Sequence, residues 1–379
     1  MRVAVMTDTM DRSAMGTAVY TKKLIDELIP LFKKEGAELT LVHSEKNDNP
    51  VYHEVREFIL PHIRIPKLSK ILSESWFLIK TRGQFDIIHY PQEANYPLFF
   101  LTDAKIAITM HSHLDGWRDY GLPIRYKQVY YTLKFFSWKI AAIFTPSEST
   151  KKGIVNIFKI NPEKVHVFHL AADRTFMNAP EKKEAERDVI EVLPVTTPYM
   201  YAPGRSDPQK NIPRVVEAFG RAKKHANLPH MLLIGSKHRG DEDSRIEEII
   251  TREGLQKSVF FLPRVEQQLM PRLFAGADAT IFPSLHEGFG LPILESMAAG
   301  TPVITSTTYS MPEVSGGAAI LVDPKNIDSI ADAIVRIGTD RLLREELSRK
   351  GRERAEGFSW NKVGVGVFSI YKRLCREEA

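Results

Sequence analysis

The stretch HEGFGLPILESMAAG, residues 286–300, decides how this part of the chain folds. The four residues before Pro283, ATIF at 279–282, have the apolar, β-branched composition of a buried strand. Pro292 suits the first turn of a helix, where its missing N–H costs nothing, and Gly300 suits the position just past a helix end. We therefore predict a strand, a glycine-containing loop and a helix.

The loop and the start of this helix have the composition of a ligand site. Gly288 and Gly290 stand directly before the helix, where free amides and the positive end of the dipole attract anions. Glu287 lies on the loop, and Glu295 lies about one turn inside the helix, where a carboxylate can accept hydrogen bonds from vicinal hydroxyls. The alternative is a plain strand–turn–helix with solvated glutamates.

Short apolar strands alternate with helical stretches along nearly the whole chain, which is typical of parallel sheets covered by helices. The expected strands are Val3–Met6, Leu39–His43, Ile87–Tyr90, Ile106–Met110, Ala142–Thr145, Val165–His169, Met200–Ala202, Met231–Ile234, Val259–Leu262, Ala279–Phe282, Val303–Thr305 and Ala319–Val322. The fold class is therefore α/β, with two doubly wound, Rossmann-like domains.

We divide the 379 residues into four parts, because one hydrophobic core rarely serves so long a chain. Residues 1–175 form an N-terminal domain and 199–358 a C-terminal one, with a linker at 176–198 that could also be a helix with a short linker. Residues 359–379 form a last helix that we expect to pack back towards the N-terminal domain. Ligands of open parallel sheets bind beyond the carboxyl ends of the strands, so a cleft between facing domains should hold the site.

A second loop carries two cations. In YAPGRSDPQKN, residues 201–211, Arg205 and Lys210 stand on a turn between a strand and a helix, which suits a clamp for a pyrophosphate. Alone, such cations are more often solvent-facing. Together with the 286–300 motif, we interpret them as part of a nucleotide site.

These motifs carry a family resemblance. HEGFGLPILESMAAGTPVITS resembles the signature of the retaining glycosyltransferases of family 4, whose E-x7-E motif is matched by Glu287 and Glu295. Gly204, Arg205, Lys210 and Asn211 resemble the family's G-R-x4-K-N element. The resemblance implies the GT-B architecture of two facing Rossmann-like domains and a nucleotide-sugar donor, without a catalytic metal or other cofactor.

The resemblance also implies residue roles. Glu295 would bind the donor ribose, and Glu287 would hold donor sugar and phosphate with the backbone of the adjoining residues Gly288, Phe289, Gly290 and Leu291. Backbone near Val265 would lie against the nucleobase. Gly16 matches a glycine near donor phosphate and acceptor, although the family often has Gly-Gly where this chain has Met15-Gly16.

One histidine completes the expected site. His111 follows the strand at 106–110, and the family commonly has a His-Asp pair there, with the histidine near the donor sugar. This chain has His111-Ser112-His113 instead. A lone histidine is as often structural as functional. On the strength of its place after this strand, His111 is a candidate catalytic residue.

Composition limits the cellular compartment and the kinds of ligand to expect. The single cysteine, Cys375, excludes an intrachain disulfide and a cysteine-built metal site. No run of eighteen apolar residues and no signal peptide stand out, so we expect a cytoplasmic protein. The net charge of +5 is too small to argue for nucleic acid.

Two N-terminal segments combine cations with aromatics. Residues 56–82 hold six Lys or Arg against two Glu, and residues 117–139 hold five against one Asp, with eight aromatics. Such segments suit an anionic membrane face, so we predict a peripheral membrane contact on the cytoplasmic side. The alternative is that the aromatics belong to the core and the cations to its solvated rim.

The sequence thus predicts a retaining glycosyltransferase that moves a hexose from a UDP- or GDP-sugar to a hydroxyl acceptor, a lipid-linked acceptor or a growing glycan. A phosphorylase or sugar-nucleotide epimerase of the same architecture is one alternative. A non-catalytic nucleotide-sugar-binding protein is the other.

Overall fold

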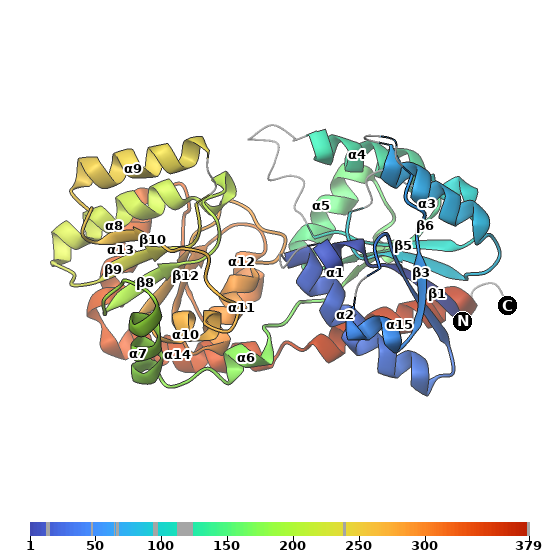
Figure 1. The fold of residues 1–379 in the computed structure, drawn as a ribbon. Helices are drawn as coiled ribbons and strands as arrows, with labels where there is room; N and C mark the ends of the chain where they lie inside the picture. Colours follow the sequence, from blue (N-terminus) through green and yellow to red (C-terminus); the bar gives the residue numbers. More distant parts are fainter. Residues whose placement is uncertain are drawn as a thin grey trace. The chain divides into compact units, whose positions relative to one another are not determined.

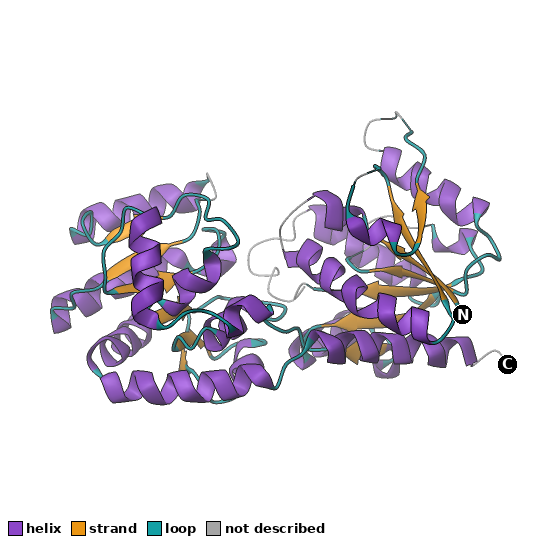
Figure 2. Cartoon of the chain, turned by 60° about the horizontal axis from the view of Figure 1, so that its bottom comes forward, coloured by secondary structure: helices purple, strands orange, loops and turns teal. Residues whose placement is uncertain are grey.

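A computed structural model describes residues 1–12, 16–46, 48–63, 65, 68–93, 98–111, 124–237 and 240–376. The chain forms two compact units, which are Met1–Leu170 with Ser359–Ala379, and Ala171–Phe358 (Figure 1). Each unit contains one fully parallel sheet between layers of helices (Figure 2). The predicted fold class is confirmed.

The first unit holds a seven-stranded sheet in the order β3-β2-β1-β4-β5-β6-β7. Its strands are β1 (Arg2–Met6), β2 (Glu38–His43), β3 (Arg56–Ile59), β4 (Ile87–Tyr90), β5 (Lys105–Thr109), β6 (Ile140–Thr145) and β7 (Val165–Val167). Its helices are α1 (Asp8–Arg12), α2 (Gly16–Lys34), α3 (Ser69–Lys80), α4 (Ile124–Phe136), α5 (Glu148–Phe158) and α15 (Trp360–Arg376). Helices α3, α4 and α5 share one core with the sheet, and α2 packs with α15 (Figure 1).

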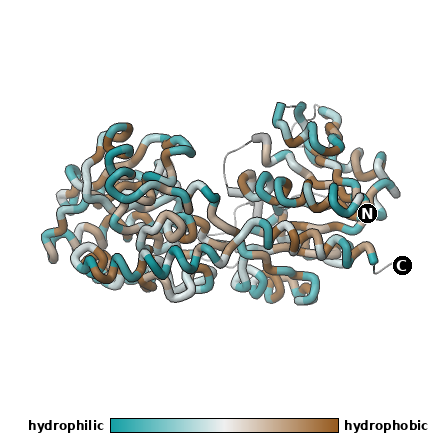
Figure 3. Tube along the Cα trace, turned by 90° about the horizontal axis from the view of Figure 1, so that it is seen from below, coloured by the Kyte–Doolittle hydropathy of each residue, from teal (hydrophilic) through white to brown (hydrophobic). Residues whose placement is uncertain are grey.

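The second unit holds a six-stranded sheet in the order β10-β9-β8-β11-β12-β13. Its strands are β8 (Tyr199–Ala202), β9 (Met231–Ile234), β10 (Val259–Phe261), β11 (Ala279–Phe282), β12 (Val303–Ser306) and β13 (Ile320–Val322). Its helices are α6 (Arg174–Met177), α7 (Lys182–Val192), α8 (Ile212–Ala226), α9 (Asp241–Glu253), α10 (Met270–Ala275), α11 (Leu291–Ala298), α12 (Met311–Ser315), α13 (Ile327–Thr339) and α14 (Arg341–Glu356). Hydrophobic and hydrophilic residues alternate along much of the chain (Figure 3), and α8 buries Val215, Val216 and Phe219 in the core of this unit.

Strand order fixes where ligands bind. Each sheet reverses its winding direction once, between β1 and β4 in the first unit and between β8 and β11 in the second. Such a switch point opens a crevice at the carboxyl ends of the two strands, because their following loops diverge to opposite faces. The loops after β8 and β11 are the two that the sequence motifs occupy.

The twelve predicted strands are all present, and the structure adds a thirteenth, β3. This edge strand pairs only with β2, and its burial is poor, with Arg56 and Ile59 exposed. Edge strands are short and polar, which leaves them without the apolar run that reveals a buried strand. From the sequence, this stretch is only the start of the basic segment at 56–82.

The segment expected as a linker and the last helix each belong to one unit. Residues 176–198 contain α7, which buries Ala185 and Val189 and packs against α10 within the second unit. Helix α15 packs along α2 in the first unit, so closely that a Cβ on Gly364 would lie 2.5 Å from Cβ of Glu27. The compact units therefore divide at 170/171 and at 358/359.

Candidate functional site

The loops after β8 and β11 lie against each other at the switch point of the second sheet. The amide of Leu285 donates to the carbonyl of Gln209 at 2.8 Å. The side-chain amide of Asn211 donates to the carbonyl of Pro283 at 3.0 Å. These bonds tie residues that stand more than seventy positions apart into one structure.

Glycines give these loops their shape. Gly204 and Gly290 both adopt φ of +95°, in the left-handed region that side chains rarely tolerate. Gly235, just past β9, packs directly on Gly204, and a Cβ there would lie 1.9 Å from the Gly204 carbonyl oxygen. Gly290 caps the start of α11, as predicted from the 286–300 motif. The helix amides therefore begin immediately beyond the loop.

Lys210 and Glu287 are brought together at this edge. Nζ of Lys210 lies 2.7 Å from Oε1 of Glu287, and both side chains are only 16% exposed. The same ammonium lies 4.6 Å from the ring centre of Phe282, the last residue of β11. Limited solvent strengthens the attraction between these two charges, so the pair forms a fixed polar point at the end of the sheet.

Glu295 projects from the first turns of α11 and is half-buried. Burial raises the pKa of this carboxyl to about 7, although the Lys210 ammonium opposes the shift and Asp173 adds to it. Within the described ranges, the carboxylate of Glu295 forms no hydrogen bond or ion pair. A partly enclosed acceptor without a protein donor suits the hydroxyl groups of a ligand.

Arg205 behaves differently from Lys210. Its guanidinium binds Asp207 in its own loop, with Nη2 2.9 Å from Oδ1 and Nε also in range, and its side chain is 42% exposed. The arginine is therefore on the predicted loop but outside the Lys210–Glu287 pair. An anion that engages Arg205 must compete with Asp207.

A third loop, which we did not predict, supports the site. Oγ of buried Ser310 lies 2.9 Å from the carbonyl oxygens of both Glu287 and Phe289 and shares its proton between them. Ser306 and Thr308 donate to the carbonyls of Ser284 and Leu285, at 2.5 and 3.3 Å. The signal was the hydroxyl-rich run STTYS at 306–310. These bonds hold the loop between Ser284 and Phe289, directly before α11.

Val265 follows β10 at the same carboxyl edge and is half-buried. Strand β9 lies between β10 and β8 in the sheet, so Val265 stands two strands away from the loop that carries Lys210. Its predicted place beside a nucleobase stays a prediction.

Gly16 and His111 belong to the first unit. Gly16 begins α2 and is exposed, and a Cβ added to it would meet nothing within 4 Å. Its expected role depends on Met15, which lies outside the described residues together with Ser112 and His113.

His111 follows β5 and is firmly held. Its backbone amide donates to Oε1 of Glu93, and its Nε2 lies 2.9 Å from the carbonyl oxygen of Pro91. Because a carbonyl can only accept, Nε2 carries the proton. His111 thus stands at the carboxyl edge of the first sheet with its orientation fixed.

The acidic run at 241–243 opens α9, and Ser206 donates to Asp243. Over the described ranges, no three His, Cys, Asp or Glu side chains gather as a metal-ligand set.

Comparison with known proteins places two family domains on the chain. Residues 16–176 match the family "Glycosyltransferase Family 4", and residues 183–354 match "Glycosyl transferases group 1". A similar curated protein is the O-antigen chain mannosyltransferase B of Escherichia coli, 30% identical over 61% of this chain and 60% of that protein. The chain therefore matches less than two thirds of that relative's length.

Two further relatives extend the comparison. The MMP alpha-(1->4)-mannosyltransferase of Mycolicibacterium hassiacum is 26% identical over 77% of this chain and 71% of its own. The solved structure of HepE from Anabaena, in complex with UDP and glucose, superimposes with a TM-score of 0.75 over 98% of this chain and 100% of that one. At 16% identity, this last match establishes a shared fold alone.

Proposed function

We propose, on the premise that this chain belongs to the GT4-type glycosyltransferases of GT-B fold, that it transfers a hexose from a nucleoside diphosphate sugar to a hydroxyl acceptor with retention. In this reaction the bond from the sugar C1 to the phosphate oxygen breaks and a bond to the acceptor oxygen forms. The acceptor proton leaves with the nucleoside diphosphate. The enzyme must therefore bind and stabilise a departing dianionic group.

The observation that carries the proposal is the Lys210–Glu287 pair beside Glu295 at the switch point. Lys210 supplies positive charge for the diphosphate, and the amides at the start of α11 add the helix dipole. Glu295 offers an acceptor for the ribose hydroxyls. Glu287 orients Lys210 and is the candidate contact for the donor sugar.

The transferred sugar is proposed to be mannose, because both curated relatives described above are named mannosyltransferases. The fold is shared with a protein solved with UDP and glucose, which supports a nucleotide-sugar donor. UDP- and GDP-linked hexoses are therefore the donors to test.

A panel of UDP, GDP, ADP and their sugars, screened by thermal shift, tests the proposal first, since a ligand of the folded state raises the unfolding midpoint. We expect one nucleotide to stand out. NMR of the product from that donor and an acceptor should then show a new glycosidic bond with the donor's anomeric configuration. Sugar phosphate or epimerised nucleotide as the product would identify a phosphorylase or epimerase, and binding without turnover a binding protein.

Turnover is expected to persist in excess EDTA. The resemblance to family 4 implies a mechanism in which cationic side chains, here Lys210 and Arg205, replace a metal in stabilising the diphosphate. The measurement is the initial rate with and without chelator, at equal ionic strength. A rate lost in EDTA and restored by Mg²⁺ or Mn²⁺ would contradict this expectation.

The acceptor is proposed to lie at a membrane surface. In the described part of the chain, no helix has the length and apolar character needed to span a bilayer. Helices α3 and α4, however, cover the same face of the first sheet and expose large apolar side chains. These are Trp76 and Ile79 on α3, Tyr131 and Phe135 on α4, and Trp138 beyond it, interspersed with the exposed cations Lys70, Lys80, Lys127 and Lys134.

The exposed fractions of these aromatic side chains support the membrane interpretation of the basic segments. Phe135 and Trp138 are 65% and 67% exposed, so they are not core residues, whereas Phe77 and Leu133 of the same segments are buried. Exposed aromatics beside cations suit an anionic headgroup layer, where each cation contributes at most about 1 kcal/mol. Attachment would be peripheral and sensitive to salt.

Purified protein is expected to bind anionic vesicles at low salt and to leave them at high salt. Replacing Phe135 and Trp138 with serine should reduce cosedimentation with vesicles while donor binding stays unchanged. Leu342→Ser is the matched control, since Leu342 is 76% exposed on α14 of the second unit. Wild-type protein that ignores anionic vesicles at low salt would favour a soluble glycan acceptor.

A further inference from the structure

A chain of buried hydrogen bonds crosses the first unit. The hydroxyl of Tyr371, on α15, lies 2.5 Å from Nδ1 of His89 on β4. Nε2 of His89 lies 2.9 Å from Oγ1 of Thr109 on β5, and this hydroxyl lies 3.2 Å from the hydroxyl of Tyr20 on α2. All four side chains are buried. One continuous polar network thus joins four elements of the fold.

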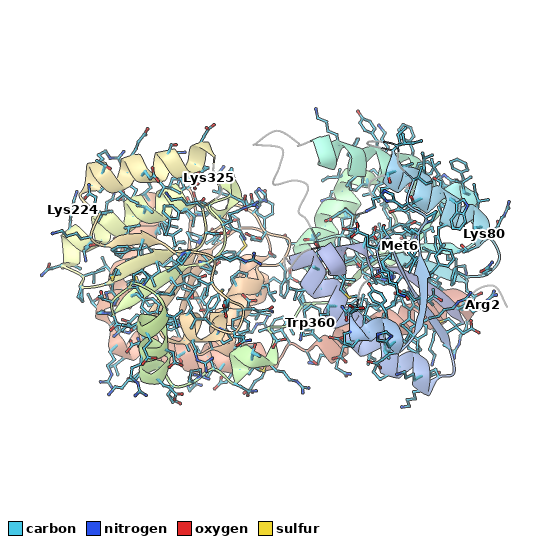
Figure 4. All side chains as sticks on the ribbon, viewed as in Figure 1. Arg2, Met6, Lys80, Lys224, Lys325 and Trp360 are labelled. Atoms are coloured by element: carbon cyan, nitrogen blue, oxygen red, sulfur yellow. The ribbon has the colours of Figure 1, made fainter. Side chains whose placement is uncertain are left out.

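The network ends on His111. The ring of Tyr20 meets the His111 imidazole edge to face, with centroids 4.5 Å apart and planes at 74°. Trp360, the first residue of α15, packs against the same Tyr20 ring at 6.1 Å, and Figure 4 marks its place at the start of that helix. Helix α15 is therefore linked to Tyr20, the residue that contacts His111, in two ways. Trp360 packs on the Tyr20 ring, and Tyr371 begins the chain of hydrogen bonds that ends at the Tyr20 hydroxyl.

The members of this network stay neutral. Burial, together with the nearby His111, lowers the pKa of His89 to about 3. Burial also raises the pKa of Tyr20 and of Tyr371 well above the usual value of a tyrosine. A neutral imidazole has one donor and one acceptor, and both are used here. The network consequently carries no net charge, and its hydrogen bonds fix the positions of its members.

His111 itself is held in one tautomer. Since Nε2 donates to the Pro91 carbonyl, Nδ1 of the neutral ring carries the lone pair. No described residue donates to this Nδ1. The ring therefore offers a single acceptor nitrogen whose direction is set by Pro91, Glu93 and the Tyr20 ring.

We propose that Tyr20 is a positioning residue for His111, and that its network to α15 presents Nδ1 as the acceptor for a sugar hydroxyl. The proposal rests on the proposed function, because it places His111 in the transfer reaction. Helix α15 lies beyond both family-matched ranges, which end at 176 and 354. A segment outside the recognised domains thus completes the catalytic apparatus of the first unit.

Two substitutions test the network without removing a ring. Tyr20→Phe and Tyr371→Phe each delete one buried hydroxyl, and Tyr371 does not itself contact His111. Tyr199→Phe is the matched control, because Tyr199 is equally buried and donates one bond of 2.9 Å to the Leu273 carbonyl in the second unit. Similar losses of thermal stability are expected in all three variants.

The readouts differ between the network and the control. Side-chain NMR of the histidines should show the His111 ring signals at their wild-type positions in Tyr199→Phe and displaced in the two network variants, because the Tyr20 ring that packs on His111 loses its hydrogen-bonded support. The kcat of these two should fall about tenfold with KM for the donor unchanged, a scale set by one misplaced hydrogen bond. Adding either substitution to His111→Ala should cost nothing further, because coupled residues are not additive.

The outcomes separate two failures. Network variants that match Tyr199→Phe in the His111 ring signals and in kcat would overturn the positioning role, even when His111→Ala is impaired. A fully active His111→Ala would overturn the place of His111 in the reaction and with it this inference. The NMR arm needs no substrate, so it judges the network even if no donor is found and the proposed function itself fails.

Discussion

Replacing Lys210 with methionine is expected to lower kcat by about 10²- to 10³-fold, the usual cost of removing one group that stabilises charge in the transition state. Lys210 is the only cation that the structure pairs with a motif glutamate among the described residues of this site. Methionine keeps most of the aliphatic stem over Phe282 and removes the ammonium. Affinity for the nucleoside diphosphate should fall, while affinity for the nucleoside alone should not.

The same substitution leaves the Glu287 carboxylate half-enclosed without its partner, which costs about 1–3 kcal/mol of folding free energy. The double variant Lys210→Met/Glu287→Gln should recover most of that stability and remain inactive. Lys224→Met is the control, because Lys224, in the last turn of α8 (Figure 4), forms an ion pair of the same 2.7 Å length with Glu253. Turnover in Lys210→Met equal to that in Lys224→Met would remove Lys210 from the mechanism.

The sequence was sufficient to predict that the loops after β8 and β11 meet, but not that Lys210 and Glu287 form an ion pair there. Lys210 and Glu287 each follow a buried strand, and carboxyl ends of neighbouring parallel strands meet at one edge, so their proximity follows from pattern alone. The helix start at Gly290 and Pro292 was equally readable from backbone chemistry. What needed three-dimensional structure was the choice of partner, because a flexible cation can reach several acids.

Arg205 illustrates that limit. The sequence gives Arg205 and Lys210 the same chemistry and nearly the same place, yet Arg205 binds Asp207 only two residues away. Local loop geometry decides this, and no periodicity describes a loop. The hydroxyls of Ser306, Thr308 and Ser310 were missed for the same reason, since they act on carbonyls of a loop about 23 residues earlier.

The hidden polar network of the first unit shows a different limit. His89 and Thr109 read as ordinary strand residues, and Tyr371 reads as one apolar position of a helix. Their contact depends on a helix nearly three hundred residues away packing on a central strand. Apolar patterning predicts that such a helix is buried, but not which hydroxyl meets which imidazole.

Glu295→Gln is expected to stabilise the free protein and to weaken donor binding, two effects of opposite sign from one carboxylate. In the folded state the pKa of Glu295 is raised to about 7 by burial. A raised pKa means that the folded state binds the proton more tightly than the unfolded chain. This carboxyl therefore favours the fold at low pH, and its contribution is lost as pH rises through about 7. Glutamine never ionises, so its advantage in melting temperature should be larger at pH 8 than at pH 5.

Binding has the reverse dependence on pH. Ribose hydroxyls donate to the ionised carboxylate, so a bound nucleoside favours the deprotonated form of Glu295 and lowers its pKa. Wild-type affinity should consequently fall as pH drops below about 7, by up to about tenfold per unit while the free form takes up the proton. Calorimetry with the nucleoside, which has no phosphate to titrate, measures this directly. The glutamine variant should bind weakly with no such slope, and a 2′,3′-dideoxynucleoside should bind both proteins alike.

Each result excludes a different explanation. A wild-type affinity that is flat between pH 5 and 8 would mean that Glu295 does not accept the ribose hydroxyls, whatever its protonation in the free protein. Equal melting temperatures of wild type and variant at pH 8 would instead mean that the carboxylate is better solvated than its position on α11 implies. Both effects are expected together: the advantage of the glutamine variant in melting temperature grows with pH, and wild-type affinity for the nucleoside falls as pH drops. Together they would show that the burial which destabilises the Glu295 carboxylate also makes it a strong acceptor. A poorly hydrated carboxylate gains most from a ligand's hydroxyls.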